Sequence, residues 1–160
     1  MPAVDAEHKL INGQGGYNLN VIIHIIILSM LFISSIKDIK SKKISMTVLL
    51  IYGLVICLMT FLHHNMTLLD RISGMLIGAF LLFISRVTKE QIGFGDGLVF
   101  IVTGLGIGFW DNLLLLCYSM SLGCMFALFM WAVKKVKRNS TFPFVPFIGM
   151  GYLILMLNKF

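Results

Sequence analysis

Long apolar runs separated by short polar connections dominate the chain. Because about 20 apolar residues cross a bilayer as a helix, the pattern predicts six membrane-spanning helices. They lie at Leu19–Ile36, Ile44–Leu62, Leu68–Val87, Leu98–Phe109, Leu113–Val133 and Phe142–Leu157. The fourth run is short and rich in glycine (Gly104, Gly106, Gly108), which predicts a distorted helix buried among its neighbours. The predicted fold class is all-α, a polytopic bundle of six transmembrane helices.

Composition agrees with a chain embedded in lipid. Apolar residues make up 58% of the sequence, charged residues 12%, and the mean hydropathy is +0.93. The first 18 residues are polar and Gly-rich, without the charge pattern or cleavage site of a signal peptide. We assign residues 1–18 no fold, and the sequence leaves open whether they are disordered or native. Residues 19–160 are predicted to form one membrane domain.

Positive charges predict the orientation of the bundle, since Lys and Arg stay preferentially on the cytoplasmic side of short loops. Of 13 Lys and Arg residues, ten flank or fill connections one, three and five: Lys37, Lys40, Lys42, Lys43, Arg86, Lys89, Lys134, Lys135, Lys137 and Arg138. We therefore expect both termini outside, with Asp38, Glu90 and Asp96 at the cytoplasmic face. These cations flank apolar spans, so their expected partners are anionic lipid head groups and not nucleic acid.

Cysteine and histidine patterns give no metal site. Cys57, Cys117 and Cys124 fall within predicted spans, where we interpret them as packing residues. The chain has no Cys-x-x-Cys pair and no His-Glu-x-x-His motif. We expect neither a metal nor a cofactor.

Asp96 stands in the segment Gly93-Phe94-Gly95-Asp96-Gly97, directly before an apolar run. An aspartate in this place can simply cap a helix. A cap does not need three glycines, however, and glycines let a backbone be approached closely. Leu98 replaces the third glycine of a dinucleotide-binding loop, which excludes that motif. The segment favours a functional acid.

Asp38 follows the first apolar run, between Lys37 and Lys40. Taken alone, it is interpreted as a solvated loop acid neutralised by those lysines. Both Asp38 and Asp96 are predicted at one face of the membrane, however, and they can approach each other if the first and fourth helices pack side by side. Two adjacent carboxyl groups cannot both ionise easily, so they share a proton and can act as an acid–base pair.

At these residues the sequence resembles the bacterial type IV prepilin peptidases, membrane aspartic proteases of the Gly-x-Gly-Asp kind. The resemblance rests on Asp38-Ile39-Lys40 followed by Ile44, on Gly93–Asp96, and on the segment Thr141–Phe147, in that order on six spans. It implies an endopeptidase of the bacterial cytoplasmic membrane that removes the short basic leader from prepilins or prepilin-like secretion proteins. It implies Asp38 and Asp96 as the catalytic pair.

The resemblance also implies that Gly93 and Gly95 shape the loop of the second acid, while Pro143 and Pro146 shape the last helix. Ser45 and Met46 replace a frequent Pro-Asn, and Val99 replaces a frequent Lys. The zinc-binding domain of the larger, bifunctional members is missing, so a compact peptidase without N-methyltransferase activity is expected. As a separate hypothesis, Glu90 attracts the cationic leader; a solvated charge beside Lys89 is the alternative.

Two other functions remain open at this point. The acids can serve as a proton relay in a small transporter or ion-conducting bundle, with the glycine-rich fourth helix as a gate. A presenilin-like intramembrane protease also carries Gly-x-Gly-Asp, although there the first acid lies within a span. The sequence gives no oligomeric state.

Overall fold

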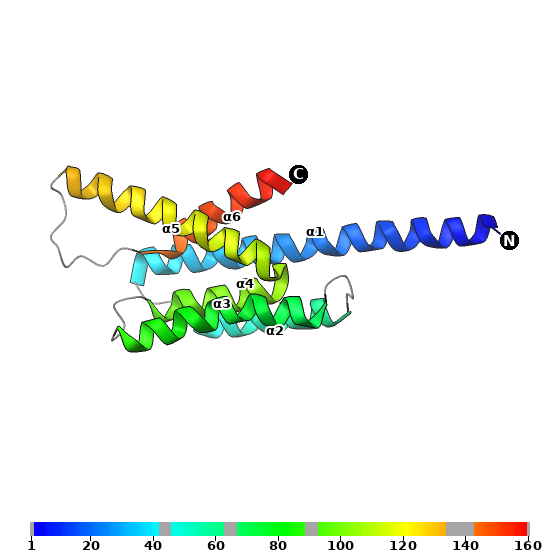
Figure 1. Cartoon of the computed structure of the whole chain (residues 1–160), viewed down its shortest axis with the longest axis horizontal. Helices are drawn as coiled ribbons and strands as arrows, with labels where there is room; N and C mark the ends of the chain where they lie inside the picture. Colours follow the sequence, from blue (N-terminus) through cyan, green and yellow to red (C-terminus); the bar gives the residue numbers. More distant parts are fainter. Residues whose placement is uncertain (1, 42–45, 63–66, 89–92, 134–142, 160) are drawn as a thin grey trace.

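The computed structural model describes residues 2–41, 46–62, 67–88, 93–133 and 143–159. These residues form six helices and contain no strand, so the chain is all-α as predicted. The helices are α1 (Pro2–Ser41), α2 (Met46–Leu62), α3 (Leu68–Val87), α4 (Phe94–Ile107), α5 (Phe109–Ala132) and α6 (Val145–Lys159). The predicted boundary at residue 18 falls inside α1, whose first half extends away from the bundle (Figure 1).

Three helices are long and apolar enough to cross a membrane: Val21–Lys40 within α1, all of α3, and all of α5. The apolar parts of α2, α4 and α6 are shorter. The protein is therefore a membrane protein with three candidate spans among its described residues, and six transmembrane helices stay a prediction.

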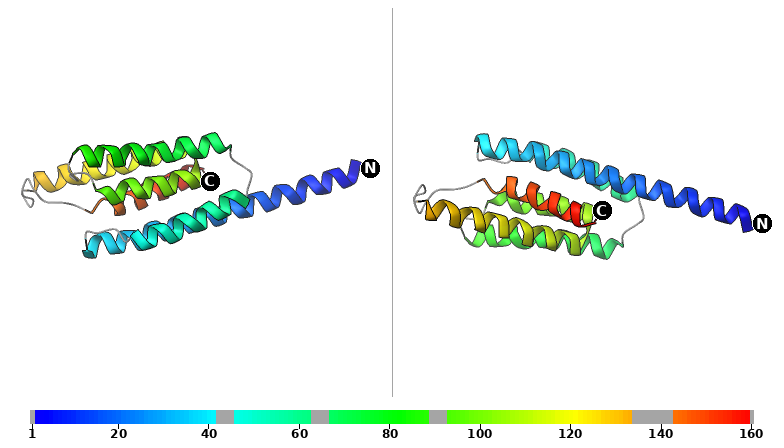
Figure 2. Two further views of the ribbon diagram at one scale, coloured as in Figure 1. Left: turned by 90° about the horizontal axis from the view of Figure 1, so that it is seen from below. Right: turned by 90° about the horizontal axis from the view of Figure 1, so that it is seen from above.

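The helices run alternately up and down the bundle (Figures 1 and 2). One end, here called the Asp38 end, holds the C-terminal ends of α1, α3 and α5 and the N-terminal ends of α2, α4 and α6. The opposite end, called the Asp70 end, holds the start of α3, the junction of α4 with α5, and the end of α6. Asp38 and Asp96 therefore share one end of the bundle, as the alternation predicted.

Helix α4 lies at the centre, in contact with α1, α2, α3 and α5. It packs against α3 through glycines. A Cβ atom added to Gly74 of α3 would lie 2.6 Å from the carbonyl oxygen of Gly104 in α4. Such approach of two backbones requires residues without a side chain, and Gly74 and Gly78 have the small-x-x-x-small spacing of close helix contacts.

The predicted distortion of the fourth helix is wrong in position. α4 is a continuous α-helix from Phe94 to Ile107. The helix ends there, and the chain changes direction at Gly108, where φ is +82°. That left-handed conformation is open to glycine and strained for other residues. Asp70 of α3 accepts a hydrogen bond from the N–H of Phe109 at 3.1 Å, so α3 caps the start of α5.

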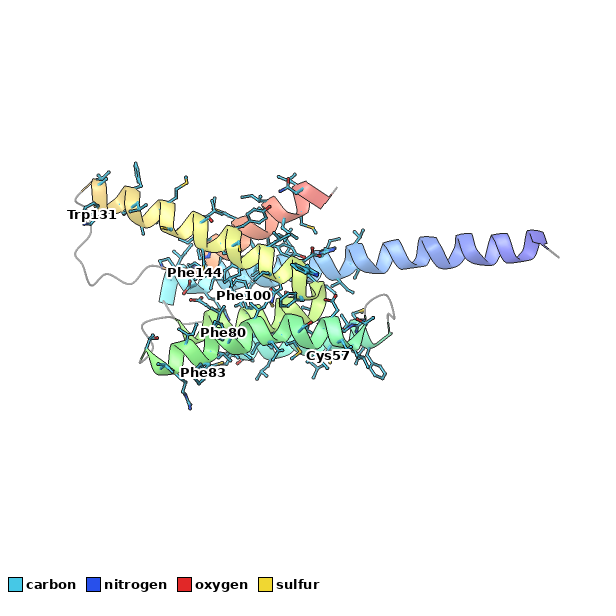
Figure 3. All side chains as sticks on the ribbon, in the orientation of Figure 1. Cys57, Phe80, Phe83, Phe100, Trp131 and Phe144 are labelled. Atoms are coloured by element: carbon cyan, nitrogen blue, oxygen red, sulfur yellow. The ribbon has the colours of Figure 1, made fainter. Side chains whose placement is uncertain are left out.

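Packing also decides which side chains are exposed. Phe80 and Phe83 on the outer side of α3, and Trp131 near the end of α5, are exposed, whereas Phe100 of α4 is fully buried (Figure 3). The interpretation of the cysteines as packing residues is wrong, because Cys57, Cys117 and Cys124 are free and exposed on the helix surfaces. In a membrane these positions face lipid, which accepts apolar side chains as readily as a core does.

Candidate active site

Asp38 lies inside α1, three residues before the helix ends, and only 7% of its surface is exposed. The interpretation of this residue as a solvated loop acid is therefore wrong. Lys37 and Lys40 are exposed while Asp38 faces the bundle. The helical period explains the difference, since α1 continues past the apolar run for one more turn and directs position 38 inward together with Ser34 and Leu31.

The carboxylate of Asp38 contacts the N-terminal end of α6. Its Oδ2 accepts a hydrogen bond from the backbone N–H of Val145 at 3.2 Å, and the backbone of Phe144 also interacts with it. The first N–H groups of a helix have no partner within the helix, and the helix dipole favours negative charge there. Asp38 therefore stabilises the start of α6, and α6 stabilises the ionised form of Asp38.

Asp96 lies in the first turn of α4 and not in a loop before it. Gly93 is the N-cap residue, without a side chain to cap the helix, and its carbonyl oxygen accepts a hydrogen bond from the N–H of Asp96 at 3.0 Å. A Cβ atom on Gly93 would lie 2.6 Å from Oδ2 of Asp96. The carboxyl group thus folds back onto Gly93, and a side chain at position 93 would displace it.

The two carboxyl groups lie at the same end of the bundle, on two helices that contact each other. Asp38 reaches this point from α1 and Asp96 from α4, and these two helices contact each other. Two carboxyl groups at close range in a partly buried place disfavour double ionisation, so a pair of this kind can hold one proton between its two members. One carboxylate and one carboxylic acid can then act on the same water molecule and the same carbonyl group.

The structure places two further residues of the predicted site, Gly95 and Pro146, within helices. Gly95 belongs to the first turn of α4 and is not part of a loop. Pro146 lies in the first turn of α6, where the missing N–H of proline leaves no helical bond unmade. Glu90, proposed as a leader contact, lies outside the described residues.

The backbone of Phe144 and Val145 is the part of the site that sequence reasoning missed. The surrounding Pro-Phe-Val-Pro-Phe pattern was interpreted as shaping the last helix, yet its main chain contacts the first acid directly. A backbone donor carries no residue-type signal. The sequence indicated this contact only in that the sixth predicted helix begins at the same membrane face as Asp38.

Another polar contact lies away from this pair. Nδ1 of His24 lies 2.6 Å from the hydroxyl of Tyr152, which joins α1 to α6. In the described parts of the chain, no three His, Cys, Asp or Glu side chains gather as ligands for a metal ion.

Comparison with known proteins identifies the family. The sequence model of the type IV leader peptidase family matches residues 25–128, about two thirds of the chain. The chain belongs to this family. It is thus a protease of the type IV leader peptidase kind, and the matched segment contains both Asp38 and Asp96.

No curated protein and no solved structure matched the chain. The matched segment of this leader peptidase ends within α5, so it does not include α6, and the contact of α6 with Asp38 comes from the structure alone.

Proposed function

We propose that this protein is an aspartic endopeptidase of the bacterial cytoplasmic membrane that cleaves the basic leader from prepilins or prepilin-like proteins. Asp38 and Asp96 are the catalytic pair, and the reaction takes place at the cytoplasmic face. The observation that carries the proposal is the position of these two acids at the same end of the bundle, on contacting helices, in a chain of the type IV leader peptidase family.

The surroundings of the two acids suggest their roles. Asp38 accepts the N–H of Val145 at the start of α6, which favours its ionised form. Asp38 is then the general base that takes a proton from water, and Asp96 is the acid that donates a proton to the scissile carbonyl oxygen. The tetrahedral intermediate collapses when the leaving nitrogen receives the proton from Asp38 and Asp96 takes back a proton from one of the two hydroxyl groups, which restores both acids. No covalent enzyme intermediate forms.

The orientation follows from charge. Lys37 and Lys40 are exposed beside Asp38, and Arg86 lies in the last turn of α3 at the same end. Cations at one end of the bundle favour its placement on the cytoplasmic side, next to anionic lipid. Membrane lipid and a prepilin substrate are accordingly the proposed partners.

The test uses the full chain in lipid vesicles with a purified prepilin as substrate. Asp38→Asn and Asp96→Asn should each abolish leader removal, because each leaves the pair without one proton-transfer group. Asp70→Asn is the matched control, an isosteric change of an acid at the opposite end of the bundle, and should leave cleavage unchanged. A chelator should have no effect. Cleavage retained by either Asn variant at Asp38 or Asp96 would exclude the two-acid mechanism.

A further inference from the structure

A groove of about 520 Å³ runs along the outside of the bundle between α1 and α6. Ile25, Leu28 and Phe32 of α1 face Pro146, Gly149 and Leu153 of α6 across it. The spacing of three or four residues along each helix means that each contributes one continuous stripe. Along α1 the groove extends over about ten residues, or about 15 Å at the rise of an α-helix.

The walls of the groove are apolar, and its floor includes the small residues Ser35 and Gly149. Ile25, Phe32 and Leu153 are exposed, whereas Ser35 and Gly149 are partly buried between the helices. The Ser35 hydroxyl donates to the carbonyl of Leu31 at 2.7 Å, within its own helix. The hydroxyl of Ser35 therefore needs no hydrogen bond from a molecule in the groove. Small residues on the floor let another helix approach closely.

One end of the groove lies next to Asp38. Ser35 precedes Asp38 by one helical turn on α1, and Pro146 directly follows Val145, whose N–H binds Asp38. The two elements that form the groove are thus the two that hold Asp38. A second cavity of about 380 Å³ lies between α5 and α6, but its walls include no residue of α1.

We propose that the α1/α6 groove binds the apolar helix that follows the leader in the substrate, so that the scissile bond at the start of this helix is held beside Asp38. This inference rests on the proposed function. Helix-in-groove binding needs an apolar stripe on the ligand and an apolar channel of matching length on the protein. The position of one end of the groove beside Asp38 favours a cleaved helix over an ordinary lipid chain, because a helix in the groove would have its end next to this acid.

The test compares two synthetic substrates on the full chain in vesicles. The long substrate has a Lys-rich leader ending in glycine, followed by an apolar helix of about 20 residues. The short substrate has the same leader and only the first few residues after the glycine. Gly149→Leu fills the groove, and its Cβ is tolerated because the nearest atom, Oγ of Ser35, is 3.7 Å away.

For Gly149→Leu we expect the KM of the long substrate to rise about tenfold or more, with kcat within about twofold. Cleavage of the short substrate should not change. Ala127→Leu, which fills the α5/α6 cavity, is the matched control and should behave as the native protein. An unchanged KM for Gly149→Leu, or an equal loss with both substrates, would overturn the inference.

Crosslinking measures binding without cleavage. p-Benzoylphenylalanine in place of Phe32 should label the long substrate, while the same group in place of the exposed Phe80 on α3 should not. Labelling of lipid alone, or of a second copy of the protein, would also overturn the inference. If the native protein cleaves neither substrate, the proposed function is wrong. If the native protein cleaves both substrates, and Gly149→Leu cleaves both with the same KM and kcat as the native protein, only the groove assignment is wrong.

Discussion

The carboxylate of Asp38 is bound by the backbone N–H of Val145, 107 residues further along the chain. This contact fastens the end of α1 to the beginning of α6 at the point where α4 presents Asp96. It gives the first acid a fixed donor from a helix N-terminus, where negative charge is favoured. The second acid has a different environment, folded against Gly93 in the first turn of α4. The two acids are therefore chemically distinct before any substrate binds.

Val145→Pro should slow cleavage about tenfold to a hundredfold, because it removes the N–H from which Asp38 accepts a hydrogen bond. Proline is tolerated at the first position of a helix, so α6 should still form. The measurement is kcat for leader removal, with the unfolding temperature as the check on folding. Val145→Ala keeps the N–H and serves as the control. Equal rates for the Pro and Ala variants would show that the hydrogen bond does not matter for catalysis.

Gly93→Ala should reduce cleavage at least tenfold with little loss of stability. The new Cβ would lie 2.6 Å from Oδ2 of Asp96, so the carboxyl group must turn away from its place beside Asp38. Gly53→Ala is the control, since its Cβ would meet a side-chain atom of Val102 at 3.4 Å. The measurement is the initial rate of leader removal from one prepilin, compared between the two variants and the native protein at equal amounts of folded protein. Native activity in Gly93→Ala would mean that the position of Asp96 is not critical.

Gly74→Ala should destabilise the bundle by about 1–3 kcal/mol. An added Cβ would lie within 3.0 Å of three backbone atoms, one of Gly104 and two of Gly108, and a backbone cannot move aside as a side chain can. In a helix that lacked this contact, Ala would stabilise relative to Gly. The sign of the change in unfolding free energy, followed by circular dichroism in detergent, therefore tests the α3–α4 contact. A stabilised Gly74→Ala would contradict it.

Asp70→Ala should lower the free energy of unfolding by about 1 kcal/mol, because the Phe109 N–H at the start of α5 loses its acceptor. Asp70→Asn keeps an acceptor oxygen and should be close to native. Because Asp70 lies at the end of the bundle opposite the acid pair, kcat should stay native in both variants. A large loss of kcat in a folded Asp70→Asn protein would mean that this acid also takes part in the chemistry.

Much of the site was predictable from local patterns. The length of the apolar runs and the short connections fix the alternation of helices, and alternation alone puts position 38 and position 96 at the same end. The glycines around Asp96 predicted close approach by another backbone, and this stays a prediction, because the contact seen at Gly93 is with the side chain of Asp96 itself. Helix ends were predicted less well, since α4 and α5 each begin four residues before the expected start. The first turn of a helix often holds polar residues, so a helix that is predicted from its apolar positions starts too late.

The amino-acid sequence by itself determined the helical class, the apolar surface and the candidate acids, because each depends on residue type and on spacing along one helix. Only the tertiary structure decided that Asp38 is buried and bound by the N–H of Val145, that α4 breaks after Ile107 and not within its span, and that α1 and α6 leave a groove between them. The physical reason is that these features arise between helices. A backbone donor is the same in every residue but proline, so nothing in the one-dimensional pattern shows which carboxylate it will meet.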